Sequence, residues 1–75
     1  MNIDVTILFY AIRNTSPTGG WLPMYSVDGH QYGDTYARTS YTQAQALQIA
    51  RMLADAEAQR YAGDWNIIIK EGISK

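Results

Sequence analysis

Apolar and polar residues alternate most regularly near the start of this 75-residue chain, over residues 3–13. The odd positions from Ile3 to Ala11 are all apolar, whereas the even positions begin polar and become apolar at Leu8, Tyr10 and Ile12. Successive side chains of a strand point to opposite faces of a sheet, so this period of two predicts a strand with one buried face. The second half of that strand is predicted to be apolar on both faces.

A second extended segment, Trp21–Val27, is followed by Asp28-Gly29 and then by a short third segment, residues 30–32. An Asp-Gly pair between two such segments predicts a tight hairpin, because a type I′ turn needs positive φ at both central residues. A two-residue turn places Tyr25 opposite Tyr32 and leaves Ser26 and Gln31 on the other side. Residues 34–41 are compatible with either a strand or a loop.

Residues 42–61 lack glycine and proline, and their apolar side chains recur at helical spacing. Thr42 followed by Gln45 predicts a capping box at the start of a helix, with Ser40 and Gln43 as an alternative start. Gly63 predicts that this helix ends near Tyr61 or Ala62.

The last predicted strand covers residues 64–70, and residues 71–75 read as a polar tail. A chain of this length forms one domain, residues 1–75. The element order β-β-β-α-β predicts an α+β fold of two layers. Its sheet is expected to have three or four strands, antiparallel or mixed, with one long helix on one face.

Two helical residues do not fit the predicted division into buried and solvent-facing sides. The apolar side of the helix contains Ala46, Leu47, Ile49, Ala50, Leu53, Ala54 and Tyr61. Met52 lies on the solvent-facing side, as an ordinary exposed residue or as a contact for a partner. Glu57 projects from the apolar side, where it reaches water, pairs with Arg60, or is held by a tyrosine hydroxyl or His30.

Composition excludes several classes of protein. The absence of cysteine excludes disulfides and thiolate metal sites. The net charge of −1 lacks the basic excess that nucleic-acid binding needs. The longest apolar run, residues 7–12, is too short to span a membrane, and the N-terminus lacks the features of a signal peptide, so a cytoplasmic location is expected.

Candidate catalytic and metal-binding residues are few. The single histidine, His30, flanks a tight turn, where a catalytic base would lack a rigid support. His30 with Asp28 and Asp34 could chelate a divalent ion only at the tip of a hairpin. Asp55 and Glu57 point apart on a helix. We therefore expect a protein that is not an enzyme and that uses no metal or cofactor.

One helix can cover only one face of the sheet, which predicts an uncovered apolar face on the other side. The alternative is that the hairpin, with Tyr25, Val27 and Tyr32, folds back over it. An uncovered face predicts a protein-binding module whose partner is a second copy or a larger target. Accessory and inhibitor proteins of phages and mobile elements have this size and build. The residues expected to contact the partner are Leu8, Tyr10, Ile12, Trp21, Tyr25, Tyr32, Met52 and Ile68.

The tyrosine content supports an alternative from another class, a binder of small planar molecules such as nucleotides. Tyrosine and tryptophan rings can stack on a nucleobase. The residues that would line such a site are Trp21, Tyr25, Tyr32, Arg38 and Glu57. Single-stranded nucleic acid would also need a basic groove beside the rings, which the sequence does not indicate.

Overall fold

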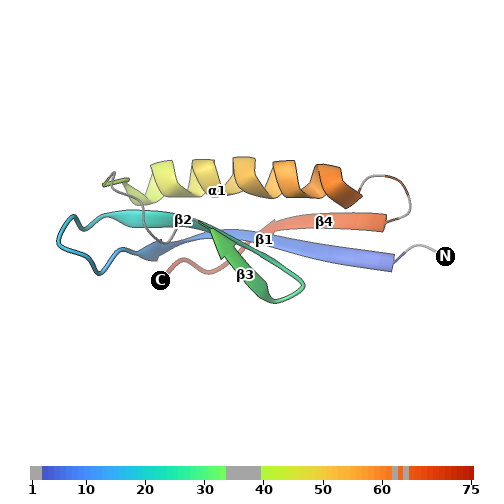
Figure 1. Ribbon diagram of the computed structural model, residues 1–75, viewed down its shortest axis with the longest axis horizontal. Coiled ribbons are helices and arrows are strands. Elements are labelled where there is room, and N and C mark those ends of the chain that lie inside the picture. The colour runs from blue at the N-terminus through green and yellow to red at the C-terminus, as the bar shows by residue number, and fades with distance from the viewer. Residues whose placement is uncertain (1–2, 34–39, 62, 64) are drawn as a thin grey trace.

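The computed structural model describes residues 3–33, 40–61, 63 and 65–75. Its elements are β1 (Ile3–Arg13), β2 (Trp21–Val27), β3 (His30–Gly33), α1 (Gln43–Ala58), a 3-10 turn (Gln59–Tyr61) and β4 (Trp65–Glu71). The strands form one mixed sheet in the order β3-β2-β1-β4, and α1 lies along one face of it (Figure 1). β1 pairs antiparallel with β2 and parallel with β4. The predicted two-layer α+β fold is confirmed.

The β2–β3 hairpin has the predicted turn and register. Asp28 and Gly29 have φ angles of 49° and 91°, as a type I′ turn requires. Tyr25 lies opposite Tyr32. Asp28 also fastens the hairpin to β1, because its N–H donates to the Thr6 carbonyl oxygen over 2.9 Å and its Oδ1 accepts the Thr6 N–H over 3.0 Å.

The helix begins with the predicted capping box. The Thr42 hydroxyl accepts the Gln45 N–H over 3.1 Å, and the Gln45 side-chain oxygen accepts the Thr42 N–H over 3.0 Å. The helical segment ends at Tyr61 as expected, but its last three residues form the 3-10 turn rather than α-helix. Gly63 follows with a φ of 117°.

The core lies between a stripe of alanines on α1 and the odd-numbered face of β1. Ala46, Ala50 and Ala54 recur every fourth residue and are fully buried. They face Val5 and Ile7, which are also buried, together with part of β2. Small side chains let the helix backbone approach the sheet closely. Leu47, Ile49 and Leu53, on either side of the stripe, are only half-buried.

The expectation of a polar tail over residues 71–75 was wrong. Glu71 belongs to β4, and the next residues run beside β1. The Gly72 N–H donates to the Phe9 carbonyl oxygen over 2.8 Å, and the Arg13 N–H donates to the Lys75 carbonyl oxygen over 2.8 Å. The reason is length: β1 has 11 residues and β4 has 7, so the end of β1 has backbone groups left for the tail to pair with.

Replacing Ala50 by leucine tests the close approach of helix and sheet. We expect Ala50→Leu to lower the free energy of unfolding by about 1 to 3 kcal/mol, because the larger side chain forces the layers apart. Ala44, which is exposed on the same helix, gives the matched control. Urea unfolding followed by far-UV circular dichroism measures both variants. Equal stability of Ala50→Leu and Ala44→Leu would contradict this packing.

Candidate functional site

The face of the sheet opposite α1 carries an open groove of about 610 Å³. Its floor is formed by the even-numbered side chains of β1, Leu8, Tyr10 and Ile12, which are half-buried. These residues point away from the helix because Ile7 and Ala11, at odd positions of the same strand, point into the core. The other residues that line the groove are Ser26, Gly29, Gln31, Lys70, Glu71, Gly72, Ile73 and Lys75.

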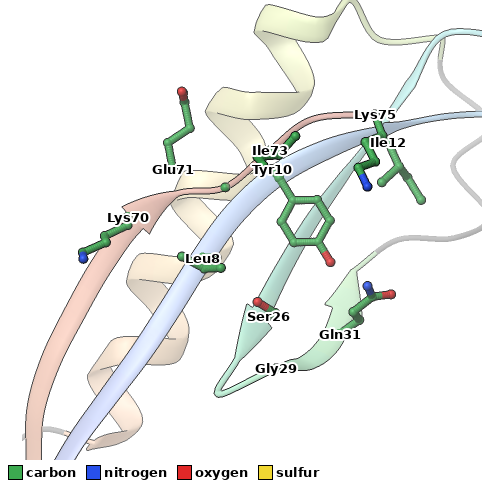
Figure 2. Close-up of a pocket in the computed structure, with 11 residues that line it drawn as sticks. Leu8, Tyr10, Ile12, Ser26, Gly29, Gln31, Lys70, Glu71, Ile73 and Lys75 are labelled. Atoms are coloured by element: carbon green, nitrogen blue, oxygen red, sulfur yellow. The ribbon is translucent and has the colours of Figure 1, made fainter.

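Two segments of the chain form the walls of the groove, one on each side of this floor. The β2–β3 hairpin bends away from the helix (Figure 1) and contributes Ser26, Gly29 and Gln31. The end of β4 and residues 72–75 form the opposite wall. Figure 2 shows the ring of Tyr10 projecting from β1 toward the hairpin. The groove therefore depends on the tail as much as on the strands.

The charged side chains that face the groove are cationic. Lys70 lies on the same face of the sheet as Leu8, its neighbour in register across the β1–β4 pair. Glu71 also borders the groove, but its side chain points away from Lys70, to the other side of the strand (Figure 2). Lys75 contributes a second ammonium group at the far end.

The hydroxyl of Tyr10 is the most unusual polar group of the groove. Its oxygen is buried, and it has no hydrogen-bond partner among the described residues. Burial raises the pKa of Tyr10 above its ordinary value, so the hydroxyl remains protonated at neutral pH. A buried hydroxyl without a partner costs about 1 to 3 kcal/mol. As a hydroxyl it can donate one hydrogen bond.

The residues predicted to contact a partner do not form one surface. Leu8, Tyr10 and Ile12 line the groove. Ile68 belongs to β4 and lies beside the groove, where it pairs with Thr6 of β1. The three predicted aromatic residues of β2 and β3 lie on the helix side instead; they are Trp21, Tyr25 and Tyr32. Met52 is 65% exposed on the outer surface of α1.

The alternative in which the hairpin covers the second face with Tyr25, Val27 and Tyr32 is wrong. Tyr25 lies opposite Phe9 and Val27 opposite Ile7, which places both on the helix side. Sequence reasoning missed the contribution of the tail, Ile73 and Lys75, because its polar composition gives no sign of backbone pairing. The two-residue turn did indicate that Ser26 and Gln31 lie on the side of the hairpin opposite Tyr25 and Tyr32, but not which of these sides faces the helix.

Glu57 joins a second polar cluster, at the end of the helix. Its side chain is 12% exposed and lies 3.4 Å from the Arg60 guanidinium, which is 74% exposed. The same carboxylate oxygen accepts a hydrogen bond from the Tyr25 hydroxyl over 3.4 Å. Two of the contacts expected for Glu57, with Arg60 and with a tyrosine hydroxyl, therefore occur together. An ion pair with so exposed a partner adds little stability.

The residues of the alternative ligand site are only partly brought together. Tyr25 stacks on Tyr32 with ring centroids 5.5 Å apart, next to Glu57. Trp21 lies four residues away along β2, where the Arg13 guanidinium is 5.3 Å from its ring centroid. Arg38 lies outside the described residues.

Other candidate chemistry finds no assembled site in the described part of the chain. His30 is exposed beside the turn, and Asp34 lies outside the described residues. No group of three acidic or histidine residues that could hold a metal ion occurs in the described ranges. No described helix is long and apolar enough to cross a membrane. The chain matches no protein-family model, and comparisons with curated proteins and with solved structures give no match either.

The contact between Tyr25 and Glu57 predicts a loss of stability at alkaline pH. Burial, followed by the charge of Glu57, raises the pKa of Tyr25 in the folded protein. The unfolded chain then loses the proton first, so this stabilisation is complete below pH of about 10 and is lost as pH rises through the folded pKa.

We expect Tyr25→Phe to weaken the decline of the free energy of unfolding above pH of about 10. Tyr10→Phe acts in the same direction because burial raises the pKa of Tyr10 as well. The double variant should therefore show the weakest dependence on pH. Urea titrations at several pH values measure it, and a decline as steep in the double variant as in the parent would contradict this assignment.

Proposed function

We propose that this protein is a non-enzymatic protein-binding module that holds an extended segment of another protein in the groove on the helix-free face. The observation that supports this most strongly is the apolar floor of Leu8, Tyr10 and Ile12, which no helix in the described part of the chain covers. An apolar surface of this kind on a small protein usually marks a binding site. A module that occupies a segment of its partner suits the accessory or inhibitor role of many phage and mobile-element proteins.

The spacing of the floor residues suits a segment in the extended conformation. Leu8, Tyr10 and Ile12 are alternate residues of one strand, so they span about 13 Å along β1. An extended partner also presents every second side chain on one face, at the same interval. The groove volume of about 610 Å³ lies within the usual range for binding sites, about 300 to 1,000 Å³.

The polar groups of the groove favour an acidic partner. Lys70 and Lys75 supply positive charge, and the side chain of Glu71 is turned away. Charged groups at the rim add little affinity each, but they select partners of opposite charge. The Tyr10 hydroxyl can donate a hydrogen bond to a carboxylate or a backbone carbonyl. We therefore assign the groove to a segment that combines aliphatic residues with Asp or Glu.

Selection from a random peptide library displayed on phage tests this proposal. We expect the selected peptides to combine aliphatic residues at alternate positions with Asp or Glu. Lys75→Glu reverses one groove charge, so it should shift the selection away from acidic peptides. Arg51→Glu is the matched control, since Arg51 lies on the helix, over the Phe9 ring. The same shift in both variants would contradict the groove as the source of the preference.

Affinity of a selected peptide for groove variants gives a second test. We expect Tyr10→Ala to weaken binding at least about tenfold, because it removes a central ring and the hydroxyl donor. Met52→Ala, at an exposed position of the helix, is the control and should bind as the parent does. Isothermal titration calorimetry measures both. Amide shifts confined to α1 in a ¹⁵N NMR titration would instead place the peptide elsewhere and overturn the proposal.

A further inference from the structure

β4 is an open edge of the sheet. It is the outermost strand in the order β3-β2-β1-β4 and pairs with β1 alone on its inner side. Its register with β1 is unbroken from Trp65 to Glu71, so the strand contains no bulge. In the described part of the chain, no strand pairs with its outer side. An open edge of this kind presents backbone N–H and C=O groups that another strand can bind.

β4 lacks the features that usually protect an edge strand. It has seven residues with no proline or glycine, and its charged residues are confined to the last two, Lys70 and Glu71. The other edge strand, β3, is protected by its length, because it has only four residues and ends at Gly33. Short strands, prolines, bulges and central charges are the common devices that prevent edge pairing. Unlike the β3 edge, the β4 edge can therefore accept a further strand.

The helix leaves part of β4 uncovered. α1 packs mainly over β1 and β2 and makes few contacts with β4. On the helix side of β4, Trp65 is 41% exposed and Ile69 is 36% exposed. Pairing with a further strand would cover these side chains together with the open backbone groups.

We propose that β4 pairs antiparallel with the β4 of a second copy of this chain, about a twofold axis, to form one continuous sheet. One antiparallel register pairs all seven residues, and it is centred on Ile68. In this register Ile68 meets Ile68 of the second copy, and Ile67 meets Ile69. Cross-strand pairs of β-branched residues are among those that stabilise sheets.

The charges of β4 are complementary in this register. Lys70 lies opposite Asn66 of the second copy, and the Asn66 amide donates to the Asp4 carboxylate over 2.9 Å. The Lys70 ammonium is thereby brought next to Asp4 of the other chain. Glu71 lies opposite Trp65, so no charged residue of the strand faces a like charge. This complementarity of the strand with itself identifies the occupant of the edge as a second copy.

Charge variants at Ile68 test the pairing, because a residue on the twofold axis meets its own copy. We expect the parent chain to form dimers in sedimentation velocity experiments at concentrations up to about 0.5 mM, since small interfaces associate weakly. Ile68→Lys and Ile68→Glu should each be monomeric, since like charges directly opposite destabilise a pair. An equimolar mixture of the two should form dimers again. Tyr10→Ala, in the groove, should dimerise as the parent does.

Cross-linking gives a second measurement that also traps a weak dimer, and an introduced cysteine is the sole thiol because the chain has no cysteine of its own. Directly opposite residues of antiparallel strands have Cα atoms about 4.5 to 5.5 Å apart, within the range that a disulfide bridges. We expect Ile68→Cys to form a disulfide-linked dimer on mild oxidation. Met52→Cys, at a more exposed position, should cross-link far more slowly.

Three results would overturn the proposal. The first is a parent chain that remains monomeric at every concentration together with slow cross-linking of Ile68→Cys. The second is a dimer that persists in both charge variants, which would place the contact on another surface. The third is a mixture of folded charge variants that stays monomeric although the parent dimerises. Circular dichroism of each variant establishes that it is folded before the comparison is made.

Discussion

The width of one helix is the constraint on which this structure depends. An α-helix with its side chains is about 10 to 12 Å across. Strands lie about 4.8 Å apart, so one helix covers roughly two of them. α1 covers β1 and β2, which the alanine stripe allows it to approach closely. The fold therefore buries one face of two strands well, and the described residues include no second helix that could cover β4 or the opposite face.

The uncovered face becomes a groove because of two backbone features. The type I′ turn at Asp28-Gly29 fixes the hairpin that forms one wall, and the hydrogen bonds of Asp28 to Thr6 hold it against β1. The other wall exists because β1 is longer than β4, so the C-terminal residues pair with its free end. The floor residues between these walls, Leu8, Tyr10 and Ile12, are only half-buried. The shape of the groove thus follows from backbone pairing, and its chemistry from the even-numbered residues of β1.

Most of the fold could be predicted from local rules that act within a few residues. The two-residue period of β1, the Asp-Gly turn and the Thr42 capping box each have a strong local cause, and each is confirmed. Features that depend on residues far apart in the sequence were harder to predict. The sequence did not decide whether the sheet is antiparallel or mixed, because the parallel pairing of β4 with β1 joins residues about sixty positions apart. The pairing of the tail was missed for the same reason.

The candidate site shows where such reasoning stops. Leu8, Tyr10 and Ile12 could be identified because an apolar even-numbered face has no helix to pack on. Trp21 and Tyr25 were grouped with them on residue type alone, and strand parity places both on the opposite face. Aromatic content indicates that a protein has surface to bury, whereas parity and register decide which side of the sheet carries it.

The groove and the β4 edge face different directions, so both can be occupied at once. The groove opens perpendicular to the sheet, whereas an added strand at β4 extends the sheet in its own plane. In a pair centred on Ile68, residues of the same parity meet, so both helices lie on one side and both grooves on the other. Two grooves on one rigid sheet can engage two segments of one partner, and such bivalent binding can exceed the affinity of a single site by a factor of about 10² to 10⁴. A weak groove in a small protein would then suffice for a tight complex.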